Sequence, residues 1–339
     1  MAKVAGFGRL LPCRLKERGP FKAEFYMQEI SERFYREALR IRRVEEEIIR
    51  VYDTDVIKSP VHLSIGQEAV VVAVCSHLTQ KDVVYATYRG HAAYLAKGGS
   101  LDRMVAELYG KSTGLARGKA GSMHLGDMSV NMIGTSAIVA SGLPNALGHA
   151  FALQQQNIDA IVVCFFGEGA TDEGVWHETM NFAGLRKLPI LFVCENNAYA
   201  IYSHVKDRMA EPNLCERAQA YRVSATSVRG GDIFDMHNAA GDAIAAIRAG
   251  DGPRFLEIET YRWRDHVGPG EDRHIGYRPD EELDAWREAD QVARLAAQLD
   301  AETRAAIDRE VEEELKRAFD AAAAADIPDV EVMYDNVIQ

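Results

Sequence analysis

Short apolar runs alternate with amphipathic segments through the middle of the chain. An unbroken apolar run is typical of a strand that is buried on both faces of a sheet. Such runs cover residues 158–166, 189–194, 223–228 and 254–261. The intervening residues 173–186 and 235–248 have a helical pattern. Because strands that alternate with helices are joined by right-handed crossovers, this order predicts an α/β fold with a mostly parallel, doubly wound sheet flanked by helices.

The rest of the chain is mostly helical in pattern. Apolar residues recur at helical spacing among charges over residues 24–51, and a charged helical pattern returns from about residue 280 to 325. Shorter predicted elements are a buried helix over 66–78, a strand over 83–86, a long loop over 110–135 and a small-residue helix over 140–155. We therefore expect an N-terminal arm (1–22), one domain (23–326) and an extended C-terminal tail (327–339).

The overall charge of the chain excludes some classes of partner. The 339 residues are 47% hydrophobic and 27% charged, which is ordinary for a globular protein. The chain has 39 basic and 51 acidic residues, and a net charge of −12 disfavours binding to nucleic acid or to anionic membranes. No apolar run reaches the roughly 18–20 residues of a membrane span.

The cysteines give no sign of a metal or redox site. They are five in number, widely spaced, and include no pair with two residues between them: Cys13, Cys75, Cys164, Cys194 and Cys215. Reduced, packed thiols in a cytoplasmic protein are the expected arrangement.

One segment carries the clearest chemical signal. It opens with Gly167-Glu168-Gly169 after one predicted strand and closes with Asn196-Asn197 after the next, with 26 residues between Gly169 and Asn196. Ligands of open α/β sheets bind beyond the carboxyl ends of the strands, where these two ends are expected to meet. Glycines let a phosphate approach the backbone, a helix N-terminus attracts anions, and carboxylate and amide oxygens suit Mg²⁺. The segment therefore predicts a site for a metal ion and a diphosphate.

Two other glycine motifs do not fit the chain. A dinucleotide fingerprint requires glycine three residues after Gly169, where the chain has Asp172. A P-loop requires glycine five residues before Gly110-Lys111-Ser112, where the chain has Val105. Neither kind of nucleotide binding is supported.

The segment from Gly167 to Tyr199 resembles the thiamine diphosphate motif in the E1 α subunits of 2-oxo acid dehydrogenases, which include pyruvate, branched-chain 2-oxo acid and acetoin dehydrogenases. The resemblance extends over about residues 25–320 and includes residues 62–68, 88–91, 118–124 and 260–266. It implies the thiamine-diphosphate-binding fold, with thiamine diphosphate and Mg²⁺ as cofactors. It also implies a 2-oxo acid or acetoin as substrate, with acyl transfer to a lipoyl-bearing E2 component.

The resemblance implies roles for residues at both ends of the motif. Glu168, Asn197 and the carbonyl group of Tyr199 would hold Mg²⁺. The backbone N–H groups of Gly169 and Ala170 would bind the diphosphate. The metal carboxylate of the family is most often Asp, but branched-chain relatives also carry Glu, so the oxygen ligand is preserved.

Further cofactor contacts are implied outside the motif. Tyr88 and Arg89 would bind the diphosphate, for which the planar guanidinium group of arginine is well suited. Ala137 and Val139 would contact the aminopyrimidine through backbone groups, which depend little on the side chain.

Two histidines are implied catalytic residues. His266 would lie on a loop with the composition of a flexible lid, and His62 near the substrate end of the cofactor. A neutral histidine near pH 7 exchanges protons with a carbonyl oxygen or a departing acyl group. Val267 stands where animal pyruvate dehydrogenases have a regulatory serine, so phosphorylation control at this position is not expected.

The resemblance also implies a partner chain. In the family a separate β subunit binds the pyrimidine half of the cofactor and supplies a glutamate that assists its activation. An α₂β₂ heterotetramer is therefore expected, with a lipoyl acyltransferase E2 as a further partner.

Three functional hypotheses remain from the sequence. The first is an E1 α subunit that acts on a 2-oxo acid or acetoin and transfers the acyl group to lipoyl. The second is a two-subunit ketol transferase or acyloin synthase that forms C–C bonds without lipoyl. The third is a non-catalytic relative that serves as an assembly partner.

Overall fold

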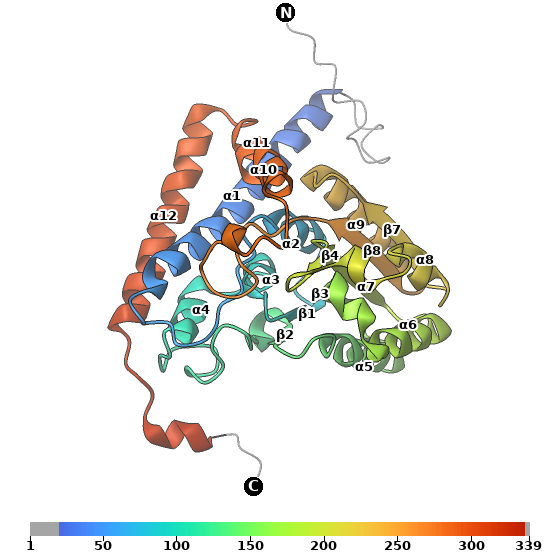
Figure 1. Ribbon diagram of the computed structural model, residues 1–339, viewed down its shortest axis with the longest axis horizontal. Coiled ribbons are helices and arrows are strands. Elements are labelled where there is room, and N and C mark those ends of the chain that lie inside the picture. Colours follow the sequence, from blue (N-terminus) through green and yellow to red (C-terminus); the bar gives the residue numbers. More distant parts are fainter. Residues whose placement is uncertain (1–19, 336–339) are drawn as a thin grey trace, which may run out of the picture.

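A parallel sheet of six strands forms the centre of the structure, a computed structural model that describes residues 20–335 (Figure 1). From one edge to the other, the strands are β2 (Met132–Ser136), β1 (Val83–Thr87), β3 (Val162–Gly167), β4 (Ile190–Asn196), β8 (Arg254–Glu259) and β7 (Ser224–Val228). Every neighbouring pair is parallel. The predicted α/β fold is confirmed.

Strand β3 shows why its run of apolar residues is unbroken. Val163 and Phe165 pack into the hydrophobic core on one face of the sheet, whereas Val162, Cys164 and Phe166 pack into the core on the other face. All five side chains are at most 2% exposed. Because successive side chains of a strand point to opposite faces, a strand covered on both sides needs apolar residues at every position.

Helices cover both faces of the sheet, as a doubly wound fold requires (Figure 1). The larger core contains residues of α1 (Pro20–Tyr52), α2 (Glu68–Cys75), α3 (His91–Ala96), α4 (Leu101–Leu108), α9 (Ile233–Arg248), α11 (Gln291–Ala296) and α12 (Ala301–Ala324). The smaller core contains residues of α5 (Gly142–Gln155), α6 (Gly174–Arg186) and α8 (Leu214–Gln219). The short elements β5 (Tyr199–Ala200), β6 (Ser203–His204) and α7 (Val205–Arg208) follow β4, and α10 (Asp280–Glu288) precedes α11.

The C-terminal helix packs against the N-terminal helix. Figure 1 shows α12 running beside α1 and α4 at one side of the molecule. The Tyr35 hydroxyl donates to Asp308 at 2.6 Å, and the Arg40 guanidinium group donates twice to Glu314 at 2.9 Å. The helical C-terminal part that the sequence predicts is therefore part of the same core as α1.

Three segments differ from the expectation from sequence. Strand β2 lies where a long loop was expected. The sequence does not predict it because only Met132 and Thr135 of its five residues are buried, so its apolar pattern is weak. Residues Val330–Tyr334 form a short 3-10 helix, so the prediction of an extended tail is wrong for them. Helix α1 begins at Pro20, inside the expected arm. The rest of the arm (1–19) and the end of the tail (336–339) lie outside the described residues.

The order of the strands places a switch point beside β1. The chain runs from β1 outward to β2 and then returns to the opposite side of β1, where it forms β3. At such a point the loops after two neighbouring strands lead to opposite faces of the sheet and leave a crevice between them. The residues after β1, β3 and β4 are therefore expected to line a binding site.

Two further expectations concern membranes and thiols. None of the helices within residues 20–335 has the length and apolar character to cross a membrane. Cys75, Cys164 and Cys194 are buried as free thiols, which confirms the expected packing, and Cys215 is a half-buried free thiol. Cys13 lies outside the described residues.

The backbone before α2 provides a test of the fold. Gly66 has φ = +96°, and a Cβ atom there would lie 2.4 Å from the Trp263 side chain and 2.5 Å from the Tyr261 carbonyl oxygen. We expect Gly66→Ala to lower the free energy of unfolding by about 2–4 kcal/mol. Denaturation with guanidinium chloride measures the free energy of unfolding of the variant and of the wild type.

The control substitution is Gly148→Ala in helix α5. A Cβ atom there meets nothing within 4 Å, so this variant should gain about 0.5–1 kcal/mol from the lower entropy of its unfolded chain. Equal stabilities for the two variants would contradict the geometry described for Gly66.

Candidate active site

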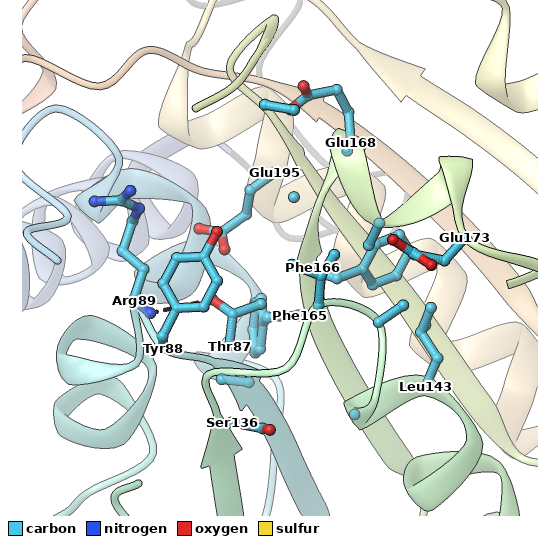
Figure 2. Close-up of a pocket in the computed structure, with 18 of the residues that line it drawn as sticks. Thr87, Tyr88, Arg89, Ser136, Leu143, Phe165, Phe166, Glu168, Glu173 and Glu195 are labelled. Atoms are coloured by element: carbon cyan, nitrogen blue, oxygen red, sulfur yellow. Dashed lines mark hydrogen bonds between the residues drawn. The ribbon is translucent and has the colours of Figure 1, made fainter. Parts of the chain in front are cut away.

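A cleft of about 300 Å³ opens at the carboxyl edge of the sheet. Its walls come from the ends of the central strands and the segments that follow them (Figure 2). The residues that line it include Gln67, Tyr88, Arg89, Ile138, Val139, Glu168, Gly169, Ala170, Glu195, Asn197, Tyr199, Ile201 and His266. Most of the residues predicted from the sequence are thus brought together in one cleft.

Glu168 lies directly after β3 with a buried carboxylate. It is 1% exposed, and burial raises the pKa of its carboxyl group to about 7. Arg208 opposes this shift: its Nη2 donates to Glu168 Oε1 at 2.6 Å, and its Nη1 binds Asp172. A buried carboxylate that has one cationic partner and lines a cleft is a suitable ligand for a divalent cation.

The two asparagines after β4 have different surroundings. Asn196 is turned toward β8, where its Nδ2 donates to Glu257 at 2.7 Å. Asn197 lines the cleft and is 9% exposed. Its Oδ1 accepts from the backbone N–H of Tyr199 at 3.2 Å. Of the two amides, only that of Asn197 therefore belongs to the cleft wall.

Tyr199 lines the cleft, but its hydroxyl group is bound elsewhere. Its hydroxyl group donates to Glu282 at 2.8 Å, on the α10 side of the loop. The proposed metal ligands are one carboxylate, one amide and one carbonyl. In the described part of the chain, no three His, Cys, Asp or Glu side chains are grouped so that they could hold a metal ion. A mixed set of oxygen donors of this kind is nevertheless what Mg²⁺ prefers.

Arg89 is a buried cation that shares the cleft. It is 9% exposed, and burial lowers the pKa of its guanidinium group to about 10. The group donates to the carbonyl oxygens of Leu63 at 2.5 Å and His266 at 3.2 Å. Within residues 20–335 it forms no ion pair with a carboxylate. Since a guanidinium group has five N–H donors, this arrangement suits an anionic ligand such as a diphosphate.

Two histidines and Tyr88 form an aromatic cluster beside Arg89. The ring centroids of His62 and Tyr88 are 4.4 Å apart, those of His62 and His266 5.3 Å, and those of Tyr88 and His266 5.6 Å. Burial, and then the charge of Arg89, lowers the pKa of each imidazole to about 3. His266 lines the cleft, whereas His62 packs against it and leaves its buried Nδ1 without a hydrogen-bond partner.

The loop that carries His266 is fastened at its base. Asp272 Oδ2 accepts from Arg262 at 3.1 Å and its Oδ1 accepts from Arg278 at 2.6 Å. All three side chains are buried. Arg278 also donates to the backbone carbonyl of Arg262 at 2.6 Å. The buried Asp272 carboxylate thus links Arg262, which precedes His266, to Arg278, which follows it. These bonds fix the base of the loop that places His266 in the cleft.

The segment after β2 matches the expectation only in part. Val139 lines the cleft together with Ile138, but Ala137 is not part of the cleft wall. Ile138 is 72% exposed and Val139 46% exposed. Gly169 is close to the backbone after β4: a Cβ atom there would lie 2.8 Å from the Cβ atom of Ala200, so a larger residue would crowd this part of the cleft.

Three residues of the site were missed from the sequence. Arg208, described above, carries no local signal. Glu195 stands next to the asparagine pair and lines the cleft. Burial raises the pKa of Glu195 to about 7. Gln67 reaches the cleft from the start of α2. Gln67 and Glu195 both lie inside segments that carry the resemblance. Their contacts join residues that are far apart in the chain, and such contacts leave no pattern in a single sequence.

Comparison with known families decides the class of the protein. A model of the family described as dehydrogenase E1 component matches residues 36–331. The chain belongs to this family. E1 enzymes are thiamine-diphosphate-dependent oxidoreductases, so the expectation of an E1 chain is confirmed.

Named relatives of this E1 chain agree in length and in subunit type. It is 36% identical to the α subunit of acetoin:2,6-dichlorophenolindophenol oxidoreductase from Bacillus subtilis, over 89% of this chain and 91% of the relative. It is 35% identical to the pyruvate dehydrogenase E1 α subunit of Zymomonas mobilis, over 90% of this chain and 87% of the relative. It is 34% identical to the pyruvate dehydrogenase E1 α subunit of Rhizobium meliloti, over 96% of this chain and 95% of the relative.

The low pKa of His62 predicts how the stability of this E1 chain changes with pH. An imidazole with a pKa of about 3 in the folded state and about 6.5 in the unfolded state binds fewer protons when folded. Its contribution to stability is therefore present above pH 6.5 and is lost as the pH falls toward 3. When the pH is lowered from 7 to 5, the free energy of unfolding of His62→Gln should fall by about 1–2 kcal/mol less than that of the wild type.

Denaturant titrations at the two pH values measure the difference, with the exposed His274→Gln as the control. If His62→Gln and the wild type lose the same stability over this range, the imidazole is not held neutral by the fold.

Proposed function

We propose that this E1 chain is the α subunit of an enzyme that cleaves a 2-oxo acid or acetoin and passes the acyl group to the lipoyl group of an E2 partner. The observation that carries the proposal is the cleft at the switch point of the sheet. There, Glu168, Asn197, Arg89 and His266 line the same cleft. The named relatives act on pyruvate or acetoin, which supports this class of substrate.

The proposed cofactor is thiamine diphosphate with Mg²⁺. Glu168, the Asn197 amide oxygen and the Tyr199 carbonyl would hold the metal ion, and Arg89 with Tyr88 would bind the diphosphate. Gly169 and Ala170 would add backbone N–H groups at the start of the turn after β3. The buried guanidinium group without a carboxylate partner supports the diphosphate assignment, since a charge buried in this way requires an opposite charge.

Proton transfer in the cleft is proposed for His266. Thiamine diphosphate supplies, when bound, a thiazolium carbon that adds to a substrate carbonyl group. Burial holds His266 neutral at pH 7, so its imidazole can share a hydrogen bond with an oxygen at the reacting carbon. A diphosphate bound to Arg89 would offset the charge that lowers the pKa of His266, and would thereby make the imidazole a better proton acceptor. His62 packs against this ring in an edge-to-face arrangement and restricts its orientation. Ala137 and Val139 are proposed to contact the pyrimidine through backbone groups.

A β subunit is the proposed partner, in an α₂β₂ heterotetramer. Ile138, Val139 and Ile201 line the cleft and are 72%, 46% and 52% exposed. Exposed apolar side chains gathered at the mouth of a binding site are typical of a surface that a partner covers. The α-subunit names of the relatives support the same assembly.

A cytoplasmic location is proposed on the state of the cysteines. Four cysteines of the described chain are free thiols, which suits a reducing compartment.

Glu168 gives the first test of the proposal. We expect Glu168→Ala in the reconstituted α/β assembly to weaken Mg²⁺-dependent binding of thiamine diphosphate by at least about 100-fold, because residues beyond the first ligands already contribute about 10–100-fold. Calorimetric titration measures the binding. The matched control is Glu178→Ala on the exposed face of α6, which should bind as the wild type does. Equal affinities for both variants would remove Glu168 from the metal site.

The reaction itself is tested with the complete set of components. The α/β assembly, a lipoyl E2, an E3 and NAD⁺ are mixed with each of several 2-oxo acids and with acetoin. We expect NADH formation with at least one of them, and loss of this activity in His266→Ala. No NADH with any substrate, together with ketol formation from aldehydes, would instead identify a C–C bond-forming ketol transferase or acyloin synthase.

A further inference from the structure

Gln67 stands at the start of helix α2 as its N-cap residue, but its side chain does not cap the helix. It is 2% exposed and extends into the wall of the cleft. There, Gln67 Oε1 accepts a buried hydrogen bond of 2.9 Å from Asn197 Nδ2. A polar side chain is thus directed at a residue 130 positions away.

The hydrogen bonds of Asn197 permit only one orientation of its amide group. Its Oδ1 accepts from the backbone N–H of Tyr199, and a backbone N–H is always a donor. Its Nδ2 faces Gln67 Oε1, which is always an acceptor. Rotation of the amide by 180° would place two donors against each other at Tyr199 and two oxygens against each other at Gln67. Both native hydrogen bonds would be lost, and buried polar groups would remain unsatisfied.

Glu195 lies beside this pair of amides. It lines the same cleft, and its carboxyl group is close to the Gln67 side chain. When ionised, this carboxyl group favours the orientation in which the NH₂ group of Gln67 faces it and the Gln67 oxygen remains for Asn197.

The orientation of Asn197 decides which of its atoms a metal ion meets. An amide oxygen has two lone pairs, and the bond from Tyr199 uses one of them. The other remains for a cation, whereas the NH₂ group of a rotated amide has no lone pair to offer. Mg²⁺ takes oxygen ligands, so rotation would remove one ligand from the set.

We propose that Gln67 is a positioning residue that fixes the Asn197 amide with its oxygen available to the metal ion, and that it thereby sets the magnesium affinity of the cofactor site. This inference rests on the proposed function, in which Asn197 is a ligand of Mg²⁺. Gln67 touches neither metal nor cofactor in this account. Its effect is exerted through Asn197 alone.

A double-mutant cycle tests this mechanism, because aspartate at position 197 would present an oxygen in either orientation. The variants are Gln67→Met, Asn197→Asp and the two combined, each in the reconstituted α/β assembly. Methionine is similar in length and volume to glutamine but offers no acceptor to Nδ2. The measured quantity is the Mg²⁺ concentration that gives half-maximal binding of thiamine diphosphate, determined by calorimetry.

We expect Gln67→Met to raise this concentration by about 10-fold or more in the wild-type background, as is typical of residues that orient a metal ligand. In the Asn197→Asp background, the same substitution should change it by less than about 3-fold. A similar change in both backgrounds, or none in the wild type, would overturn the inference.

A second variant separates positioning from folding. Gln67→Asn keeps a polar residue that is favoured at helix N-caps, but it is one methylene too short to maintain the contact with Asn197. We expect it to fold with a cooperative thermal transition at a somewhat lower temperature than the wild type, because one buried hydrogen bond is lost, while its Mg²⁺ requirement rises as in Gln67→Met. An unchanged Mg²⁺ requirement in this folded variant would also overturn the inference.

Failure of the inference is distinguishable from failure of the proposed function. If the wild-type assembly binds thiamine diphosphate without any dependence on Mg²⁺, the proposed function is wrong. If the wild type depends on Mg²⁺ and Asn197→Ala abolishes this dependence, but the Gln67 variants do not alter it, only the role of Gln67 is wrong.

Discussion

Two opposite charges buried at one edge of the sheet constrain the rest of this structure. Glu168 is 1% exposed and Arg89 9% exposed. Burial raises the pKa of the Glu168 carboxyl group and lowers the pKa of the Arg89 guanidinium group, because it disfavours the charged form of each. They reach the cleft from neighbouring strands, β3 and β1, and Figure 2 shows them on different sides of it. A ligand that contains both a cation and a diphosphate would compensate both charges at once. The geometry of the parallel sheet, which brings these strand ends together, is therefore the basis of the proposed chemistry.

The sequence predicts the parts of this arrangement that follow from local pattern. Unbroken apolar runs identify the buried strands, and glycine and asparagine after two of them locate Glu168 and Asn197. Strand β2 is missed because it is short and only partly buried. Gln67 and Glu195 are missed for a different reason. Their importance lies in donor and acceptor contacts with residues that become neighbours only when the sheet closes, and no spacing in a single sequence encodes such contacts.

The site combines a fixed interior with an open mouth. On the interior side, Asp272 fastens the loop that carries His266, and Gln67 holds Asn197 in one orientation. At the mouth, Ile138 and Val139 expose apolar surface. This division matches an active site that two subunits complete: one supplies a rigid set of metal and diphosphate ligands, and the other covers the reacting end.

The central claim is that Glu168 would hold a metal ion and Arg89 the diphosphate of the same cofactor. The most direct measurement is a crystal structure of the α/β assembly grown with Mn²⁺ and thiamine diphosphate, with anomalous data recorded at the manganese edge. The account predicts a single manganese peak in contact with the Glu168 carboxylate, the Asn197 amide oxygen and the Tyr199 carbonyl, with the diphosphate on Arg89. A manganese peak away from these three oxygens, or a diphosphate that does not contact Arg89, would contradict it.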